Sequence, residues 1–436
     1  MAAVICLVLA IALSIYLGTK TKINTGIYAL LFAFVMGMVF LDLSPSSVFK
    51  TYFPTSIIAT TICPFLFFGA VNSNGTIGML AAMVGRKMKS ANRTVAPLII
   101  FAVTFALTFA TAGGEGITIP MTVFGIGICL NLGLNPALGL ISVWSGWSAT
   151  YQMPWTTLGL INGGIAAGSY GEEVATSAIW ISWVLGIVFY VLFIIVVSLF
   201  LGRKKYDIES SMAAQVSADE KIEFTKQQKL TITVIAAIMA TIIVPAIIQA
   251  IIPNPVTNFL HSKIDITICC LVGAIVLFIS GCAKVDDVIK NRIPWGLILL
   301  LMGVCTLFGL IGDLGVSEFL AEAIGNMPAF LVVPAISFIC SFLSLFVNGA
   351  TLSPMLIPLA ESLAATAGIP TAAMVGIMLT AIGVSGISPT SGGGSTCLGA
   401  VSDAKLSPII SGTMAKLAIV NMIGFAVFSV FIQFVF

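Results

Sequence analysis

Four polar interruptions of otherwise apolar sequence contain the residues best suited to bind a ligand. They lie at 111–116 (TAGGEG), 145–154 (SGWSATYQMP), 347–351 (VNGAT) and 385–396 (SGISPTSGGGST). Backbone that leaves a helix within lipid has unpaired N–H and C=O groups, so it occurs only where protein, water or a ligand satisfies them. The interruptions therefore predict a binding site at mid-membrane. The alternative is that Gly, Ser and Thr merely allow helices to pack closely.

The chemistry expected at such breaks is that of an anion held together with a cation. Half-helices that start after a break direct free N–H groups and a positive dipole end at an anion. Carbonyl ends, hydroxyls and amides suit a hard monovalent cation such as sodium. We predict a cation site at Gly113, Gly114, Glu115, Ser145, Ser148, Asn348, Gly349 and Ser388. The predicted substrate site comprises Thr111, Thr150, Asn348, Thr351, Pro389, Thr390 and Ser391.

Glu115 is the one carboxylate at an interruption that resembles a hairpin tip. Ionisable side chains at membrane depth cost at least ~2.5 kcal/mol on insertion scales and are usually functional. We expect Glu115 to handle a cation or a proton; the alternative is a solvated acid facing a cytoplasmic cavity. No Lys or Arg falls within the four interruptions or the two segments expected to form hairpins, so co-bound cations would have to offset an anionic substrate.

The composition identifies the solvent of these elements as lipid. Apolar residues make up 59% of the chain, and charged residues only 8%, against about 25% in a soluble domain. The mean hydropathy is +1.13. A net charge of +2 without a basic, aromatic-rich groove argues against nucleic acid. The nine cysteines form no CxxC pair and are expected to be small core residues that hold no metal.

Apolar stretches predict an all-α integral membrane protein with about ten transmembrane helices. These spans are expected near 2–19, 23–42, 55–75, 136–160, 176–201, 229–252, 265–282, 294–315, 372–395 and 413–436. Residues 95–132 and 330–366 are expected to form two re-entrant helical hairpins, because their second arms are too short to cross about 30 Å of hydrocarbon. The polar segment 202–228 is predicted to be a cytoplasmic linker.

The two sides of the linker are predicted to be repeats, 1–201 and 229–436. Residues 46–85 align onto 286–325 without gaps at 10 identities in 40, against about three or four by chance. A half with five crossings reverses direction, so the second repeat should be inverted in the membrane. Placing both termini outside leaves only Lys50 and Lys263 of the 19 basic residues outside, as the positive-inside rule favours.

Three segments near the start of the chain resemble a known family. The segments 22–26 (KINTG), 53–56 (FPTS) and 66–76 (LFFGAVNSNGT) are similar to the N-terminal part of the malonate and dicarboxylate carrier (MatC-type) family. The whole chain looks like a member of the wider ion-transporter superfamily, which includes the divalent anion:sodium symporters.

This resemblance implies scaffold and transport domains, a homodimer in a bacterial-type inner membrane, and an elevator mechanism. It implies sodium-coupled uptake of a small dicarboxylate, with no cofactor beyond sodium or a proton as coupling ion. In those symporters each hairpin tip carries Ser-Asn-Thr. Asn348 and Thr351 match the second tip, whereas Gly113-Gly114-Glu115 departs from the first.

Three other functions compete with a symporter. The chain could be the membrane subunit of a tripartite carrier served by a solute receptor, or a sodium/proton antiporter with Glu115 as its carrier residue. An intramembrane enzyme would need paired acids with a metal, or a nucleophile and base, at membrane depth. Neither the lone loop histidine His261 nor the Gly392-Gly393-Gly394 run, which lacks a following Lys, supplies such chemistry.

Overall fold

The computed structural model describes most of the chain. The described residues are 2–76, 79, 93–110, 118–202, 206, 224–251, 255–256, 266–293, 295–310, 313–314, 328–345, 349–401, 403 and 405–436. Within these ranges the regular elements are all helices, as the sequence predicts.

The first half of the chain contains nine described helices. They are α1 (Ala2–Thr21), α2 (Thr25–Leu41), α3 (Pro45–Tyr52), α4 (Thr55–Ser73), α6 (Ala96–Ala110), α7 (Thr118–Asn131), α8 (Pro136–Ser148), α9 (Thr157–Tyr170) and α10 (Glu172–Leu201). The expected single span at 136–160 is thus two helices, α8 and α9, separated by eight residues, and the second extends to Tyr170. The short helix α3 was not foreseen, because its eight residues are too few to mark a span.

The second half follows a similar order. Its elements are α12 (Lys226–Ile251), α14 (Ile266–Ile279), α15 (Val285–Asp287), the π-helical turn η2 (Val288–Arg292), α16 (Trp295–Gly309), α18 (Ala329–Ser344), α19 (Gly349–Leu356), the 3₁₀ turn η3 (Ile357–Leu359), α20 (Ala360–Ala367), α21 (Thr371–Val384), α22 (Gly392–Gly399) and α23 (Ser407–Gln433). The expected span 372–395 is broken between α21 and α22.

Several helix pairs cross between the halves and join them, α10 with α21 among them. Helix α2 packs against α16, and α4 packs against α14. In the α2–α16 pair a Cβ on Gly26 would overlap the backbone of Leu299, and one on Gly303 would overlap the backbone of Gly26. Only glycine permits this approach, and small residues at crossings are typical of helices in membranes.

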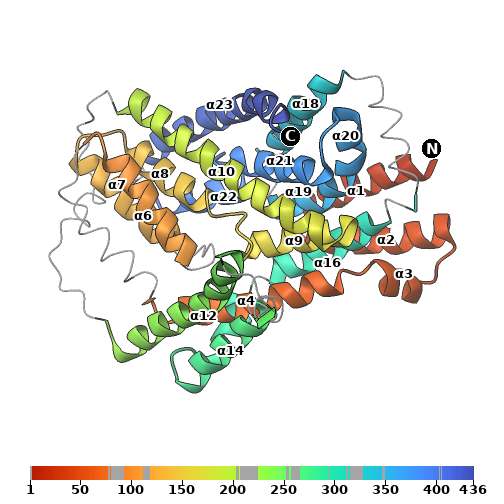
Figure 1. Ribbon diagram of the computed structural model, residues 1–436, viewed down its shortest axis with the longest axis horizontal. Coiled ribbons are helices and arrows are strands. Elements are labelled where there is room, and N and C mark those ends of the chain that lie inside the picture. The colour runs from red at the N-terminus through yellow and green to blue at the C-terminus, as the bar shows by residue number, and fades with distance from the viewer. Residues whose placement is uncertain are drawn as a thin grey trace.

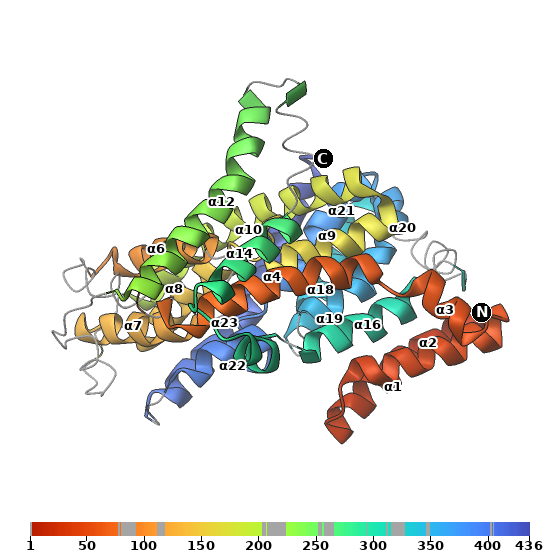
Figure 2. The ribbon, with the colours of Figure 1, turned by 90° about the horizontal axis from the view of Figure 1, so that it is seen from below.

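The elements spread along one long axis, with two apolar cores. Figure 1 shows α1–α3 at one end and α6–α8 toward the other, and Figure 2 shows α12 projecting from the body. A small core joins α1, α2 and α16 through Leu7, Ala33 and Leu307. The large core fills the remainder, around the α8, α10, α21 and α23 helices.

Apolar side chains also cover much of the outer surface. On α14 alone, Ile268 is 61% exposed and Ile279 is 83% exposed. Two helices, α10 and α23, are long and apolar enough to cross a bilayer singly, and the bent pair α2–α3, with a 108° break, makes a third if taken as one span. Other apolar helices have 10–17 residues, and the ten-span topology stays a prediction.

Candidate functional site

Residues 149–156 connect α8 to α9 through a chain of tight turns. The amide of Thr150 donates to the carbonyl of Trp147 (3.0 Å), that of Met153 to Thr150 (3.2 Å), and that of Thr156 to Met153 (3.0 Å). The chain therefore leaves the helix without leaving these amides unpaired. The α6 helix packs on this region, where the Thr108 hydroxyl lies 3.0 Å from that of Thr150.

Residues 385–391 connect α21 to α22 in the same manner. The amide of Gly386 donates to Gly383 (3.1 Å), that of Ser388 to Ser385 (3.0 Å), and that of Ser391 to Ser388 (3.0 Å). A buried side chain from α23 secures the end of α21, because the Asn421 amide nitrogen donates to the Val384 carbonyl at 2.9 Å.

Thr156 caps the first turn of α9 and also binds back across the break. Its hydroxyl oxygen accepts from the Gly159 amide at 3.1 Å. The same oxygen lies 2.8 Å from the carbonyl oxygens of both Tyr151 and Met153. One side chain thus fixes both the start of α9 and the turns that precede it.

Ser391 performs the same task at the start of α22. Its hydroxyl accepts from the Gly394 amide at 3.3 Å and lies 3.0 Å from the carbonyl oxygen of Ser388. It also donates to the carbonyl of Gly386. Each partner lies 235 residues after its counterpart in the first break. The two breaks share the pattern Pro-x-(Thr/Ser)-x-x-Gly, beginning at Pro154 and at Pro389.

A cavity lies between the two breaks and the second hairpin. Its volume is about 30 Å³, room for about two water-sized groups. Its lining comprises Trp144, Trp147, Ser148 and Tyr151 from the first half, and Ser344, Gly349, Ile382, Gly383, Gly386, Ser391 and Gly393 from the second. No lining side chain is charged. Hydroxyls and glycine backbone therefore provide its polar character, and aromatic rings form one wall. We refer to it as the central cavity.

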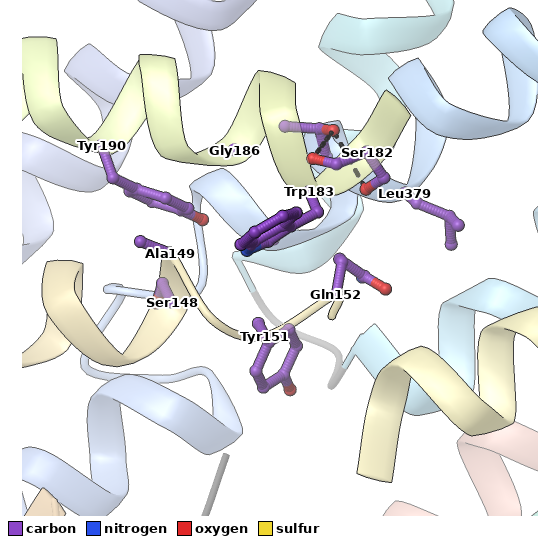
Figure 3. Close-up of a pocket in the computed structure, with 11 residues that line it drawn as sticks. Ser148, Ala149, Tyr151, Gln152, Ser182, Trp183, Gly186, Tyr190 and Leu379 are labelled. Carbon is purple, nitrogen blue, oxygen red and sulfur yellow. Dashed lines mark hydrogen bonds between the residues drawn. The ribbon is translucent and has the colours of Figure 1, made fainter. Parts of the chain in front are cut away.

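A smaller cavity adjoins the central cavity on the α10 side. It shares Ser148, Tyr151 and Gly383 with the central cavity and is otherwise lined by Ala149, Gln152, Ser182, Trp183, Gly186, Tyr190, Leu379 and Thr380. Figure 3 shows the Tyr190 hydroxyl and the indole nitrogen of Trp183 both directed toward the end of α8. We refer to it as the side cavity.

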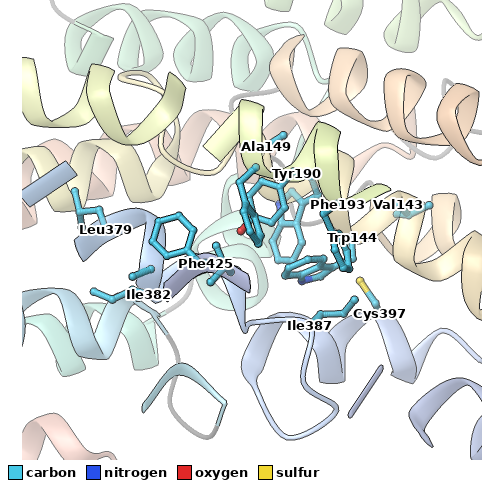
Figure 4. Close-up of a cluster of buried hydrophobic side chains, with 14 of the residues drawn as sticks. Val143, Trp144, Ala149, Tyr190, Phe193, Leu379, Ile382, Ile387, Cys397 and Phe425 are labelled. Carbon is cyan, nitrogen blue, oxygen red and sulfur yellow. The ribbon is translucent and has the colours of Figure 1, made fainter. Parts of the chain in front are cut away.

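A packed aromatic and aliphatic cluster supports both cavities from behind. Trp144 meets Tyr190 edge to face with ring centroids 5.4 Å apart, and Phe189 meets Phe425 likewise at 5.3 Å. Ile387 and Cys397 extend this cluster beneath Trp144 (Figure 4). These contacts join α8, α10 and α23 and so fix the orientation of the rings that face the cavities.

Several predicted site residues meet at the central cavity. Ser148, Gly349 and Ser391 line it. Ser388 and Thr390 are joined through their hydroxyls at 2.7 Å. The Thr390 hydroxyl also lies 2.7 Å from the carbonyl of Leu345, which ties the second break to the end of α18 in the second hairpin. The intervening Pro389 is half-buried.

Other predicted residues lie elsewhere or outside the described ranges. Ser145 is fully buried on α8 and its hydroxyl has no hydrogen-bond partner. Thr150 is buried and points its hydroxyl to the Trp147 carbonyl and to α6. Thr351 lies in α19. The following residues lie outside the described part of the chain: Thr111, Gly113, Gly114, Glu115 and Asn348.

Sequence reasoning missed two groups of residues at this site. The rings of Trp144, Trp147 and Tyr151 line the cavity, and none of them was predicted as a site residue, although Trp147 and Tyr151 lie within the first predicted break. Thr156 was overlooked because the first break was expected to end at Pro154. The repeated Pro-x-(Thr/Ser)-x-x-Gly pattern is the signal that could have found it. Among the described residues, no group of three or more His, Cys, Asp or Glu side chains could hold a metal ion.

The chain's first third matches a family of carriers. Residues 1–150 match the family model described as the dicarboxylate carrier protein MatC N-terminus. This confirms the predicted resemblance to MatC-type carriers over those residues. No curated protein sequence matches the chain significantly.

Two solved transporter structures are similar to this fold. The Alcanivorax borkumensis YdaH transporter has a TM-score of 0.61 at 13% identity, covering 91% of this chain and 89% of that protein. Neisseria gonorrhoeae MtrF, described as illuminating a class of antimetabolite efflux pumps, has a TM-score of 0.55 at 12% identity, covering 91% and 83%. The carrier match, this fold and the apolar helices indicate a multi-pass membrane transporter and not an enzyme.

Proposed function

From the carrier-family match, we propose that the chain is a secondary active transporter that takes up a small dicarboxylate of the malonate or succinate class together with sodium. The observation that carries the proposal is the central cavity between two helix breaks of like construction. Discontinuous helices with such breaks are the usual substrate sites of transporters at membrane depth.

The neutral lining of the central cavity supports cation coupling. The described lining holds no Lys or Arg to offset a substrate carboxylate. Importing a dianion against an inside-negative potential costs about 2 × 2.3 kcal/mol per 100 mV. At least two co-transported cations are therefore needed to neutralise the dianion. Sodium is the coupling ion we propose, because the breaks present hydroxyl and carbonyl oxygens, which suit a hard cation.

We further propose that 1–201 and 229–436 are inverted repeats joined by a cytoplasmic linker at 202–228. The shared hydrogen bonds of the two breaks and the reciprocal pairs α2–α16 and α4–α14 support this relation. The proposed transport domain contains the two broken helices and both hairpins, and moves as an elevator against a scaffold of the other helices. A homodimer with both termini outside completes the proposal. The mass of the complex in detergent tests its oligomeric state, and cysteine labelling near Glu172 and Ser210 tests its orientation.

Uptake into proteoliposomes tests the function. Labelled malonate or succinate should accumulate when sodium is added outside, and an inside-negative potential should accelerate uptake if more than two sodium ions accompany each dianion. Sodium replaced by choline is the control. Uptake that does not depend on sodium but follows a proton gradient would identify the proton as the coupling ion. Sodium–proton exchange unaffected by any organic acid would instead identify an antiporter. Transport that requires an added solute receptor would identify the subunit of a tripartite carrier.

A further inference from the structure

A buried hydrogen-bond donor of the side cavity lacks an acceptor. The indole Nε1 of Trp183 is buried and has no hydrogen-bond partner. An indole nitrogen can only donate. A buried donor without an acceptor costs its full desolvation free energy, so the native protein is expected to supply an acceptor there.

Three of the side-chain oxygens that line the side cavity have partners within the protein. The Gln152 carbonyl oxygen accepts from the Asn162 amide nitrogen on α9 at 2.9 Å. The hydroxyls of Ser182 and Thr380 bind one another at 3.2 Å. A molecule that enters the cavity can supply the acceptor that the Trp183 indole lacks.

Two further donors face the same space. The hydroxyls of Ser148 and Tyr190 line the same cavity. Each hydroxyl carries one O–H proton that it can donate. Figure 3 shows this pair and the Trp183 indole around one space at the end of α8. No acidic or basic side chain lines it, so the site presents neutral donors only.

We propose that the side cavity binds one carboxylate oxygen of the transported substrate, with the Trp183 N–H and the Ser148 and Tyr190 hydroxyls as donors. This inference rests on the proposed function and adds to it the side chains that donate hydrogen bonds to one substrate carboxylate. The cavity has room for about one water-sized group. Through Ser148, Tyr151 and Gly383 it borders the central cavity, so a substrate there can extend one carboxylate into it.

The test is a thermodynamic cycle. One change removes a hydrogen-bond donor from the protein, and the other removes one of the two negative charges from the substrate. Titration calorimetry in sodium buffer measures malonate and monomethyl malonate binding to the wild type, to Trp183→Phe and to Tyr190→Phe. One hydrogen bond to a charged group contributes a factor of about 10 to 100 to the binding affinity. Trp183→Phe should weaken malonate binding by that factor and monomethyl malonate binding much less, so the preference for the dianion shrinks. Tyr190→Phe should act in the same direction.

Trp180→Phe is the matched control. Trp180 lies on the same helix, is 41% exposed and does not line the side cavity. Its variant should keep the wild-type preference. Thermal unfolding in detergent identifies any variant that fails to fold, in which case the other donor variant decides.

The possible results distinguish a failure of this inference from a failure of the proposed function. Unchanged malonate binding and preference in both donor variants would show that the side cavity holds only a structural water, and would overturn the inference alone. A donor variant that loses affinity for monomethyl malonate but not for malonate would also overturn it, because the donors would then not bind a carboxylate of the dianion. A wild type that binds no dicarboxylate would overturn the proposed function, and the inference with it.

Discussion

Thr156 and Ser391 stand in equivalent places, each capping a half-helix and reaching back to carbonyl oxygens three and five residues earlier. Each also accepts from the amide of the glycine three residues later. A single hydroxyl thus fixes both the helix start and the turns that border the central cavity. The same set of hydrogen bonds in both halves links the predicted sequence repeat to the walls of the candidate site.

Removal of these hydroxyls should loosen both breaks. Thr156→Ala and Ser391→Ala should each cost about 1 kcal/mol or more of stability, the usual cost of losing a helix cap, because the proton that the hydroxyl shares with the two earlier carbonyl oxygens is lost as well. Thr156→Ser keeps the hydroxyl and should retain both stability and uptake. Thermal unfolding in detergent and proteoliposome uptake provide the measurements. Wild-type behaviour of both alanine variants would show that the caps do not shape the site.

The glycines beside the caps should not tolerate even a methyl group. A Cβ on Gly159 would overlap the carbonyl oxygen of Met153, and one on Gly394 would overlap that of Ser388. Gly159→Ala and Gly394→Ala should therefore displace the turns and abolish most uptake. Gly168 and Gly399 lie on the same two helices with nothing within 4 Å of a built Cβ. Alanine at these control positions should leave uptake near the wild-type level, and equal loss in test and control variants would contradict the steric argument.

Tyr170 should stabilise the bend in the second arm of the second hairpin. Its hydroxyl lies 2.8 Å from the carbonyl of Ile357 and 3.4 Å from the amide of Glu361, two groups that would pair in a regular helix. Tyr170→Phe should speed amide exchange of 357–361 several-fold, as hydrogen–deuterium exchange with mass spectrometry can measure. Tyr28→Phe, which removes an exposed hydroxyl, is the control. Unaltered exchange would mean that the bend holds without the tyrosine.

Glu115 should reveal the coupling ion, although it lies outside the described residues. If it is a sodium ligand, Glu115→Gln should weaken sodium activation of uptake and Glu115→Asn should partly restore it. If it carries a proton, Glu115→Gln should leave substrate binding intact and remove the pH dependence of transport. Uptake measured across sodium and pH series distinguishes the roles. Profiles identical to the wild type would identify a solvated acid.

The amino-acid sequence by itself determined the class of protein and the places where its helices break. Hydropathy and scarce charge select lipid as the solvent, and polar residues within apolar runs mark backbone that needs other partners. These signals are local in sequence, so they can be read without coordinates. The same local reading stopped at Pro154 and missed Thr156, whose role depends on hydrogen bonds across the break.

Only the tertiary structure decided which residues share a cavity. Trp144, Tyr151 and Gly349 come from three elements, and their types alone do not distinguish a cavity wall from a core. It also directed Thr150 toward α6 and left the indole nitrogen of Trp183 without an acceptor. Such relationships depend on how helices distant in sequence cross, and close packing at glycines such as Gly26 and Gly303 fixes those crossings.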